Sequence, residues 1–138
     1  MGVFLDTSFI LATRYHDDQH HKIAQNLMQR YLRGEFGRIY LSTFVFDELM
    51  TIILTKLKQP HVAITIGQDL INSSRITLLH LTKQNFWDTW QLFQKYQKRG
   101  LSFTDASILS MCAALNCNYV ATFDSHFKGL IGTNLTAT

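Results

Sequence analysis

Four acidic residues fall where the elements of a predicted parallel sheet begin or end. Two of them, Asp6 and Asp124, come directly after short apolar runs that are typical of buried strands. The other two, Glu48 and Asp105, lie in the first turns of predicted helices. In open α/β sheets, ligands bind outside the carboxyl ends of the strands. We therefore expect the four carboxylates to meet at one edge of the sheet.

Three of these acids also have structural explanations. Asp6 fits an Asx turn or a helix N-cap, and Asp124 fits the cap of the short turn 125–128. Asp105 fits the acid of a capping box that begins at Ser102. Taken singly, these roles need no ligand, so the prediction of a site depends on the acids as a group.

Glu48 is the acid that structure alone explains least well. It lies in the segment 44–57, which is so apolar that we expect the helix to be largely buried. An unpaired carboxylate is costly in such surroundings. Asp47 is the better candidate for the solvent-facing member of the pair, although the opposite assignment stays open. We therefore place Glu48 in the site.

A cation is the expected partner of acids that converge in this way. Three or four carboxylates at one sheet edge repel one another unless a positive charge neutralises them. Oxygen ligands without histidine or cysteine favour Mg²⁺ or Mn²⁺, and such ions assist phosphoryl transfer by activating water and stabilising the leaving oxygen. No Gly-rich loop with a lysine accompanies the acids, which excludes a P-loop nucleotide site. The pattern predicts metal-assisted phosphoryl transfer.

The elements that must position these acids alternate between short apolar strands and longer helices. The predicted strands cover residues 2–5, 39–42, 76–81 and 119–123. The predicted helices cover residues 9–14, from 17 or 18 to 33, 44–57, from 60 onward, 83–99 and from about 103 to 115. This alternation predicts βαβ units and an α/β fold, a three-layer α/β/α sandwich around a short parallel sheet. The residues from 129 onward stay open, with a short edge strand as one option.

Length and composition predict a single domain that covers residues 1–138. Of the 138 residues, 46% are hydrophobic and 17% are charged, and one proline leaves little room for linkers. No stretch predicts a membrane span or a secretory signal, so we expect a cytoplasmic protein without membrane contact. Cys112 and Cys117 are expected to be buried, reduced thiols. The net charge of +3 permits contact with nucleic acid without requiring it.

The acids occur in four segments with an ordered set of motifs. The segments are VFLDTSFI (3–10), STFVFDELMTIIL (42–54), LSFTDASILSMC (101–112) and NYVATFDSHF (118–127). Together they span essentially the whole chain and resemble the PIN-domain family, most of all the toxin ribonucleases of VapBC toxin–antitoxin pairs. The resemblance implies an endoribonuclease that depends on Mg²⁺ or Mn²⁺. Its expected reaction is in-line attack of metal-activated water on a phosphodiester, which leaves a 5′-phosphate and a 3′-hydroxyl.

The resemblance also assigns residues and partners. Ser8 and Thr104 match the family's small hydroxyl positions, which help to orient water or neighbouring carboxylates. The catalytic, metal-binding quartet of the family is matched by Asp6, Glu48, Asp105 and Asp124. The implied partners are an RNA substrate, a second copy of the chain in a homodimer, and a small antitoxin whose tail reaches the acidic site. The expected contact surfaces are the apolar helix segment 9–12 and the aromatic helix near Trp87.

One position departs from the family pattern. Many relatives carry a further carboxylate two residues after the fourth acid, where this chain has His126. The departure puts the binding of a second metal in doubt and raises the hypothesis of a preference for Mn²⁺ over Mg²⁺. A contact between His126 and substrate is a further option, although a histidine on a surface turn is the simpler interpretation.

Other residues have weaker claims to function. His16 and His20 have the i, i+4 spacing of a zinc protease, and His21 adjoins them. We expect His16 to lie outside the helix, and nothing nearby supplies a third ligand, so solvent-exposed histidines are the simpler interpretation. Trp90 belongs to the apolar stripe of its helix and is expected in the core. Trp87 stays open as a residue that stacks on RNA bases.

The basic run before the Asp105 motif is the predicted RNA-contact segment. Lys95, Lys98 and Arg99 lead directly into that motif. Such a run is commonly a solvated helix face, but an acidic site that cleaves RNA needs basic flanks to hold the phosphate backbone. We therefore predict that these three side chains contact RNA.

Alternative functions stay open at this point. One is a PIN nuclease that processes RNA without an antitoxin, and another is a PIN-like scaffold without activity, against which the intact quartet counts. A third, from a different class, is a non-catalytic signalling domain of receiver type. Receivers need a lysine at a strand end near the acids, and no basic residue ends a predicted strand here.

Overall fold

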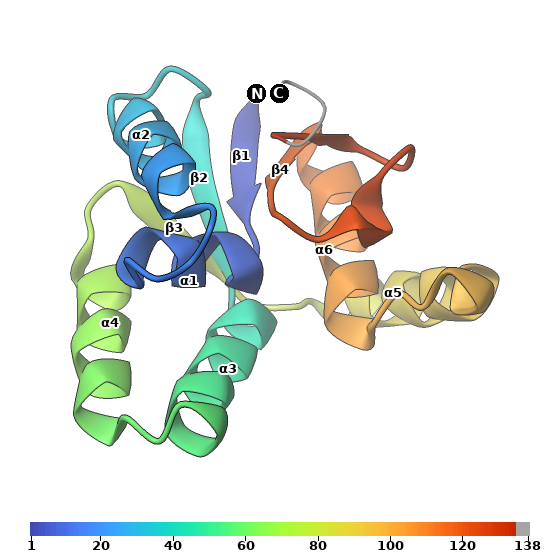
Figure 1. Ribbon diagram of the computed structural model, residues 1–138. Coiled ribbons are helices and arrows are strands. Elements are labelled where there is room, and N and C mark those ends of the chain that lie inside the picture. The colour runs from blue at the N-terminus through green and yellow to red at the C-terminus, as the bar shows by residue number, and fades with distance from the viewer. Residues whose placement is uncertain (135–138) are drawn as a thin grey trace.

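The computed structural model describes residues 1–134, which form a five-stranded parallel sheet between layers of helices (Figure 1). The strands are β1 (Gly2–Leu5), β2 (Arg38–Ser42), β3 (Ile76–Leu79), β4 (Tyr119–Ala121) and β5 (Gly132–Thr133). The α-helices are α1 (Thr7–Arg14), α2 (His21–Leu32), α3 (Thr43–Thr51), α4 (Pro60–Asn72), α5 (Lys83–Lys95) and α6 (Phe103–Leu115). The predicted three-layer α/β/α architecture is confirmed. Within the segment left open after residue 129, a short edge strand is present, and residues 135–138 lie outside the described residues.

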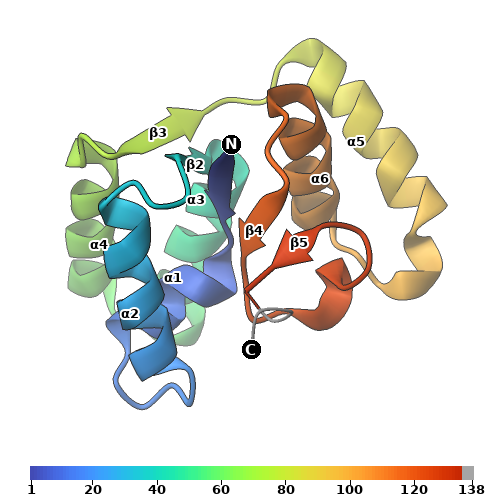
Figure 2. The ribbon, with the colours of Figure 1, turned by 90° about the horizontal axis from the view of Figure 1, so that it is seen from above.

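The order of the strands creates a reversal of the chain beside β1. The sheet runs β3-β2-β1-β4-β5, and every neighbouring pair is parallel. The chain therefore builds outward from β1 to β3 and then returns to add β4 on the other side of β1 (Figure 2). Loops that leave β1 and β4 diverge, so a crevice opens at the carboxyl ends of these two strands.

The central strand is buried along its whole length because helices cover both faces of the sheet. All four residues of β1 are buried and none is charged, as is usual for parallel sheets. Phe4 lies opposite Tyr40 on one side and Val120 on the other. The largest fully buried side chains form one core, which comprises Phe4, Leu5, Phe9, Ile10, Tyr31, Ile39, Leu41, Leu49, Ile53, Ile108 and Phe127.

Several element ends differ from the prediction. The first helix begins two residues early, at Thr7, with Asp6 at its N-cap position. The second helix begins at His21 rather than at residue 17 or 18, because the Asp18 carboxylate accepts a hydrogen bond from the His20 amide at 2.8 Å and holds a turn there. The strands β3 and β4 each end two residues early.

The helix after β2 is half exposed, so the prediction that it is largely buried is wrong. It continues from α3 into a π-helical turn, η1 (Ile52–Lys56). Its fully buried side chains are Val45, Leu49 and Ile53, whereas Leu54 and Leu57 are exposed. The helix packs against α1, α4, β2 and α6, and the side chains that point away from these elements are exposed.

The helix α5 packs on α6 through a face next to the one predicted. It lies beside α6 in both views, yet the residues that it buries are polar, namely Asn85 and Thr89. The backbone carbonyl of Asn85 accepts hydrogen bonds from the Thr89 hydroxyl at 2.6 Å and from the Ser110 hydroxyl at 3.2 Å, which makes this contact favourable. Three aromatic side chains therefore lie on an exposed surface, the aromatic face: Phe86 (43% exposed), Trp87 (53%) and Trp90 (43%). The prediction of a core position for Trp90 is wrong.

Cys112 and Cys117 are buried free thiols, as predicted. Among the helices of residues 1–134, none has both the length and the apolar character that crossing a membrane requires.

Candidate active site

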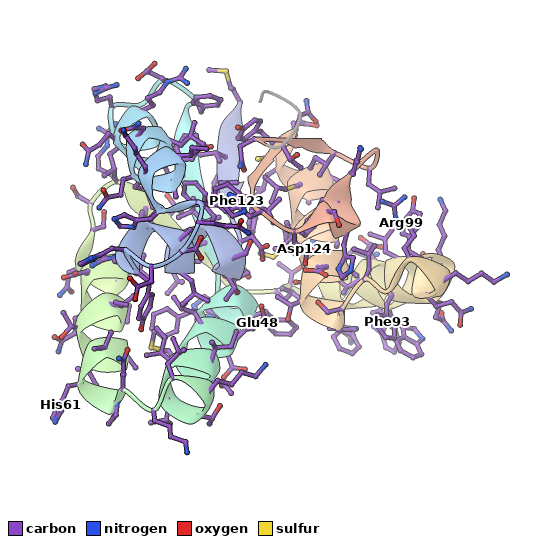
Figure 3. The ribbon with its side chains drawn as sticks, viewed as in Figure 1. Glu48, His61, Phe93, Arg99, Phe123 and Asp124 are labelled. Atoms are coloured by element: carbon purple, nitrogen blue, oxygen red, sulfur yellow. The ribbon has the colours of Figure 1, made fainter. Side chains whose placement is uncertain are left out.

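The crevice at the carboxyl ends of β1 and β4 holds a cavity of about 320 Å³. All four acids of the predicted quartet line it, together with His126, and they come from four different parts of the chain. Figure 3 shows Glu48 reaching this space from α3 and Asp124 from the segment that follows β4. The remaining lining residues are Thr7, Ser8, Leu11, Ile52, Gly100 and Ser102.

Asp6 is fixed by both of the strands that border the crevice. Its amide donates to the carbonyl of Ala121 at 3.0 Å, which extends the β1–β4 ladder by one residue. Its Oδ2 atom accepts hydrogen bonds from the Thr122 hydroxyl at 2.7 Å and the Ser8 hydroxyl at 3.1 Å. Burial raises the pKa of the Asp6 carboxyl to about 7 in spite of these donors, and the nearby Asp105 carboxylate adds to the increase.

Asp105 caps the helix α6, as its position after Ser102 suggested, and it also lines the cavity. Its Oδ2 atom accepts from the Ser102 amide at 3.1 Å, and its own amide donates to the Ser102 hydroxyl at 3.0 Å, which completes a capping box at the start of α6. Burial raises the pKa of the Asp105 carboxyl, and repulsion from Asp124 and Glu48 raises it further.

Asp124 closes the short turn that carries His126. Its Oδ1 atom accepts from the His126 amide at 2.9 Å, and its amide donates to the Thr122 hydroxyl at 2.9 Å. The turn brings the His126 imidazole over the acids, with Nδ1 3.1 Å from the Asp124 Oδ1 atom and 3.6 Å from the Asp105 Oδ2 atom. The position that seemed a surface turn thus belongs to the cavity.

Glu48 and Asp47 lie on different faces of α3. Asp47 is exposed to solvent, whereas Glu48 is half buried and lines the cavity. Within residues 1–134, the Glu48 carboxylate makes no hydrogen bond or ion pair. Its charge nevertheless acts on Asp105, as the raised pKa of that carboxyl shows.

The donor set at this cavity fits a divalent cation. One carboxylate oxygen each from Asp105 and Asp124 and one nitrogen of His126 lie within 4.8 Å of one another. The His126 Nδ1 atom is buried and has no hydrogen-bond partner among the described residues. Buried polar atoms are rarely left in this condition. Repulsion between the carboxylates also adds to the effect of burial in raising the pKa values of Asp6 and Asp105. A divalent cation would give the Nδ1 atom a partner and would neutralise the repulsion between the carboxylates.

The predicted supporting hydroxyls differ in their contacts. Ser8 donates to Asp6 and accepts from the Phe123 amide at 3.0 Å, so it links the segments that follow β1 and β4. Thr104 lines a neighbouring hollow with Glu48 and makes no hydrogen bond to the four acids. Thr122 was not singled out from the sequence, although its hydroxyl bridges Asp6 and Asp124. A threonine after a strand is too common to give a signal by itself.

The predicted RNA-contact residues also separate into two kinds. Lys95 and Lys98 are exposed, and the Lys95 ammonium lies 5.2 Å from the centre of the Tyr96 ring. Arg99 has a structural role, because its guanidinium donates to the carbonyls of His126 at 2.9 Å and Lys128 at 2.6 Å. It therefore holds the turn that carries His126.

The histidines around the start of α2 contact protein groups. The Nδ1 atom of His21 lies 2.7 Å from the carbonyl of Ala12, and the His20 ring stacks on Phe123 with centroids 4.2 Å apart. His16 lies in the loop, outside the helix, as predicted.

Comparison with known families identifies the fold of this site. A model of the PIN domain matches residues 3–130, which include all four acids. The chain belongs to the PIN domain family. This membership argues against a receiver-like domain. No curated protein matches the sequence of this PIN domain.

Solved structures with the same fold include bacterial proteins of toxin–antitoxin type. VapC20 from Mycobacterium tuberculosis, described as a toxin that cleaves the sarcin–ricin loop, is 21% identical with a TM-score of 0.80, over 93% of this PIN domain and 94% of that chain. A chain of VapBC2 from Rickettsia felis, bound to promoter DNA, is 19% identical with a TM-score of 0.68, over 96% and 97%. A chain of DNA-bound VapBC from Salmonella typhimurium is 20% identical with a TM-score of 0.67, over 96% of both.

Proposed function

We propose that this PIN domain is a single-domain endoribonuclease that uses Mg²⁺ or Mn²⁺, and that it is the toxin of a toxin–antitoxin pair. The observation that carries the proposal is the meeting of Asp6, Glu48, Asp105 and Asp124 in one cavity at the reversal of a PIN-type sheet. The likeness to VapC20 along nearly the whole chain supports the choice of RNA as substrate and of a toxin as role.

The residues of the cavity would divide the work as follows. The four acids of the quartet would hold the cation, and the oxygens of Asp6, Asp105 and Asp124 are already oriented by hydroxyl and amide donors. Glu48, whose carboxylate has no partner within residues 1–134, is free to accept a hydrogen bond from the attacking water. When bound, the cation would act as a Lewis acid that activates water and stabilises the charge on the leaving oxygen. The α6 N-terminus, where Asp105 lies, adds a positive end of a helix dipole.

Cleavage of RNA by the purified chain, free of antitoxin, tests this function. We expect single-stranded or structured RNA to be cut in Mg²⁺ or Mn²⁺ and left intact in EDTA, with 5′-phosphate and 3′-hydroxyl ends. A folded protein that binds no divalent ion would contradict the proposal. Growth arrest on expression, relieved by a small protein encoded next to it, would distinguish a toxin from a nuclease of RNA processing.

The two exposed lysines before α6 provide a prediction about RNA binding. We expect the double variant Lys95→Ala/Lys98→Ala to bind RNA roughly tenfold more weakly and with a smaller salt dependence, because two phosphate contacts are lost. Arg99 is left in place because it holds the His126 turn. Fluorescence anisotropy in EDTA at several salt concentrations measures the change. The variant Lys22→Ala/Lys58→Ala, which also removes two positive charges, is the control, and equal affinities in both variants would refute the assignment.

The proposed protein partners are a second copy of the chain and a small antitoxin whose tail reaches the acidic cavity. One of the two surfaces predicted for such contacts is unavailable, because Phe9, Ile10 and Ala12 are buried in the core. The aromatic face on α5 is exposed and remains the candidate surface.

A double substitution on this face tests its part in self-association. We expect Trp87→Ser/Trp90→Ser to weaken the dimer at least about tenfold, because large aromatic side chains dominate the energy of protein interfaces. Sedimentation velocity over a concentration series measures the effect. The control is Ile64→Ser/Ile71→Ser on α4, where both side chains are 57% exposed. A tryptophan variant that associates like the wild type would exclude the aromatic face as the dimer interface.

A further inference from the structure

His126 is set into the acidic cavity by contacts that do not involve its imidazole. The Asp124 carboxylate holds its amide, and the Arg99 guanidinium holds its carbonyl from 27 residues away in the sequence. The same guanidinium binds the carbonyl of Lys128, so both sides of the turn are fixed. The backbone of His126 is thus anchored at two points, and the imidazole takes no part in either contact.

The imidazole presents its Nδ1 atom to the carboxylates without making a hydrogen bond to them. This atom is buried, although 43% of the side chain is exposed, and it lacks a hydrogen-bond partner within residues 1–134. Its distances of 3.1 Å to Asp124 and 3.6 Å to Asp105 fit atoms that share one ion. Neighbouring ligands of an octahedral ion with bonds of about 2.1 Å lie about 3 Å apart.

We infer that His126 is a metal ligand through Nδ1, and that it makes this site prefer Mn²⁺ and other divalent transition ions to Mg²⁺. The inference rests on the proposed function only in placing a divalent cation in this cavity. Imidazole nitrogen is a good ligand for transition ions, whereas Mg²⁺ takes oxygen almost exclusively. A nitrogen among carboxylate oxygens therefore adds to the affinity for Mn²⁺ and little to that for Mg²⁺.

Electron spin-echo measurements on the Mn²⁺-loaded protein test the ligand directly. We expect the wild type to show the modulation of a coordinated imidazole nitrogen. The variant His126→Asp is expected to lose it while keeping an acidic ligand at the same place, and His80→Asp, at an exposed histidine on the same chain, is expected to retain it. A wild-type spectrum without nitrogen coupling would overturn the inference.

Calorimetric titration with Mn²⁺ and with Mg²⁺ tests the selectivity. The preference for Mn²⁺ is the Mg²⁺ dissociation constant divided by the Mn²⁺ dissociation constant. We expect this ratio to fall roughly tenfold or more in His126→Asp and to stay unchanged in His80→Asp. If His126→Asp does not fold, His126→Gln, which also removes the imidazole, is expected to lose the nitrogen signal and the preference. An unchanged ratio in the variant that folds would refute the proposed selectivity.

These measurements separate the inference from the proposed function. Nitrogen coupling in a protein that cleaves no RNA would support the ligand and contradict the nuclease. Cleavage of RNA in Mg²⁺ by a protein whose Mn²⁺ spectrum lacks nitrogen coupling would support the nuclease and overturn the ligand.

Discussion

Replacing Asp105 by Asn is expected to lower the rate of RNA cleavage roughly 10³-fold or more while leaving the fold intact. The substitution removes one of the proposed charged oxygen ligands from the cavity, and losses of this size are common when charge stabilisation at a reacting phosphate is removed. The asparagine amide oxygen can still accept from the Ser102 amide, so the capping box of α6 is retained. Initial rates in Mg²⁺ and Mn²⁺, with thermal unfolding of both proteins, measure the two parts of this prediction.

The matched control for this experiment lies next to Glu48. Asp47 is also acidic and lies on the same molecule, but it is exposed and does not line the cavity. We expect Asp47→Asn to cleave RNA within about twofold of the wild-type rate, since it changes the net charge by the same amount. Near-normal cleavage by Asp105→Asn, or equal losses in the two variants, would contradict the assignment of the site.

The stability of the metal-free protein is expected to fall as the pH rises from about 4 to above 7. The pKa of Asp6 is about 7 in the folded chain against an ordinary value of 3.8, so the unfolded chain releases this proton first. The protonated carboxyl contributes fully to the free energy of unfolding below the ordinary pKa of 3.8, and this contribution is lost as the pH passes the folded-state pKa of about 7. The difference between the two pKa values corresponds to a loss of roughly 4 kcal/mol in the free energy of unfolding. The raised pKa of Asp105 acts in the same direction.

The variant Asp6→Asn isolates this effect. Asparagine is neutral at every pH, and its amide oxygen can accept from Thr122 and Ser8 as the carboxylate does. In urea unfolding with EDTA, we expect the variant to match the wild type near pH 4 and to exceed its stability by several kcal/mol at pH 8. Adding Mn²⁺ should narrow this gap, since the cation stabilises the ionised wild-type site. A stability difference between variant and wild type that does not depend on pH would show that burial does not raise the pKa of Asp6.

The sheet and its acids could be predicted from the sequence because two strong local signals coincide. Buried parallel strands are short apolar runs, and Asp6 and Asp124 follow such runs directly. Once the strands are parallel, their carboxyl ends must meet at one edge, and the positions of the acids follow from the topology. The capping box at Asp105 is a local pattern as well, so it too could be predicted.

The contacts that could not be predicted depend on which surfaces meet. The period of α5 tells which residues share a face but does not tell which face packs on α6, and the polar Asn85 and Thr89 are buried there instead of Trp90. His126 enters the cavity because Arg99 fixes its turn from another part of the chain. No pattern within either segment indicates this partnership.

The position of β4 has a consequence for the order in which the acidic cavity forms during synthesis. Asp6 is synthesised long before one of the two hydroxyls that orient it, because Thr122 lies 116 residues later in the sequence. Bringing together two residues that are so far apart in the sequence costs chain entropy. This cost is offset only when the rest of the sheet forms its long-range contacts. A nascent chain still attached to the ribosome therefore carries β1 to β3 without a complete cavity. Synthesis itself therefore delays the complete acidic cavity until Thr122, Asp124 and His126 have been made.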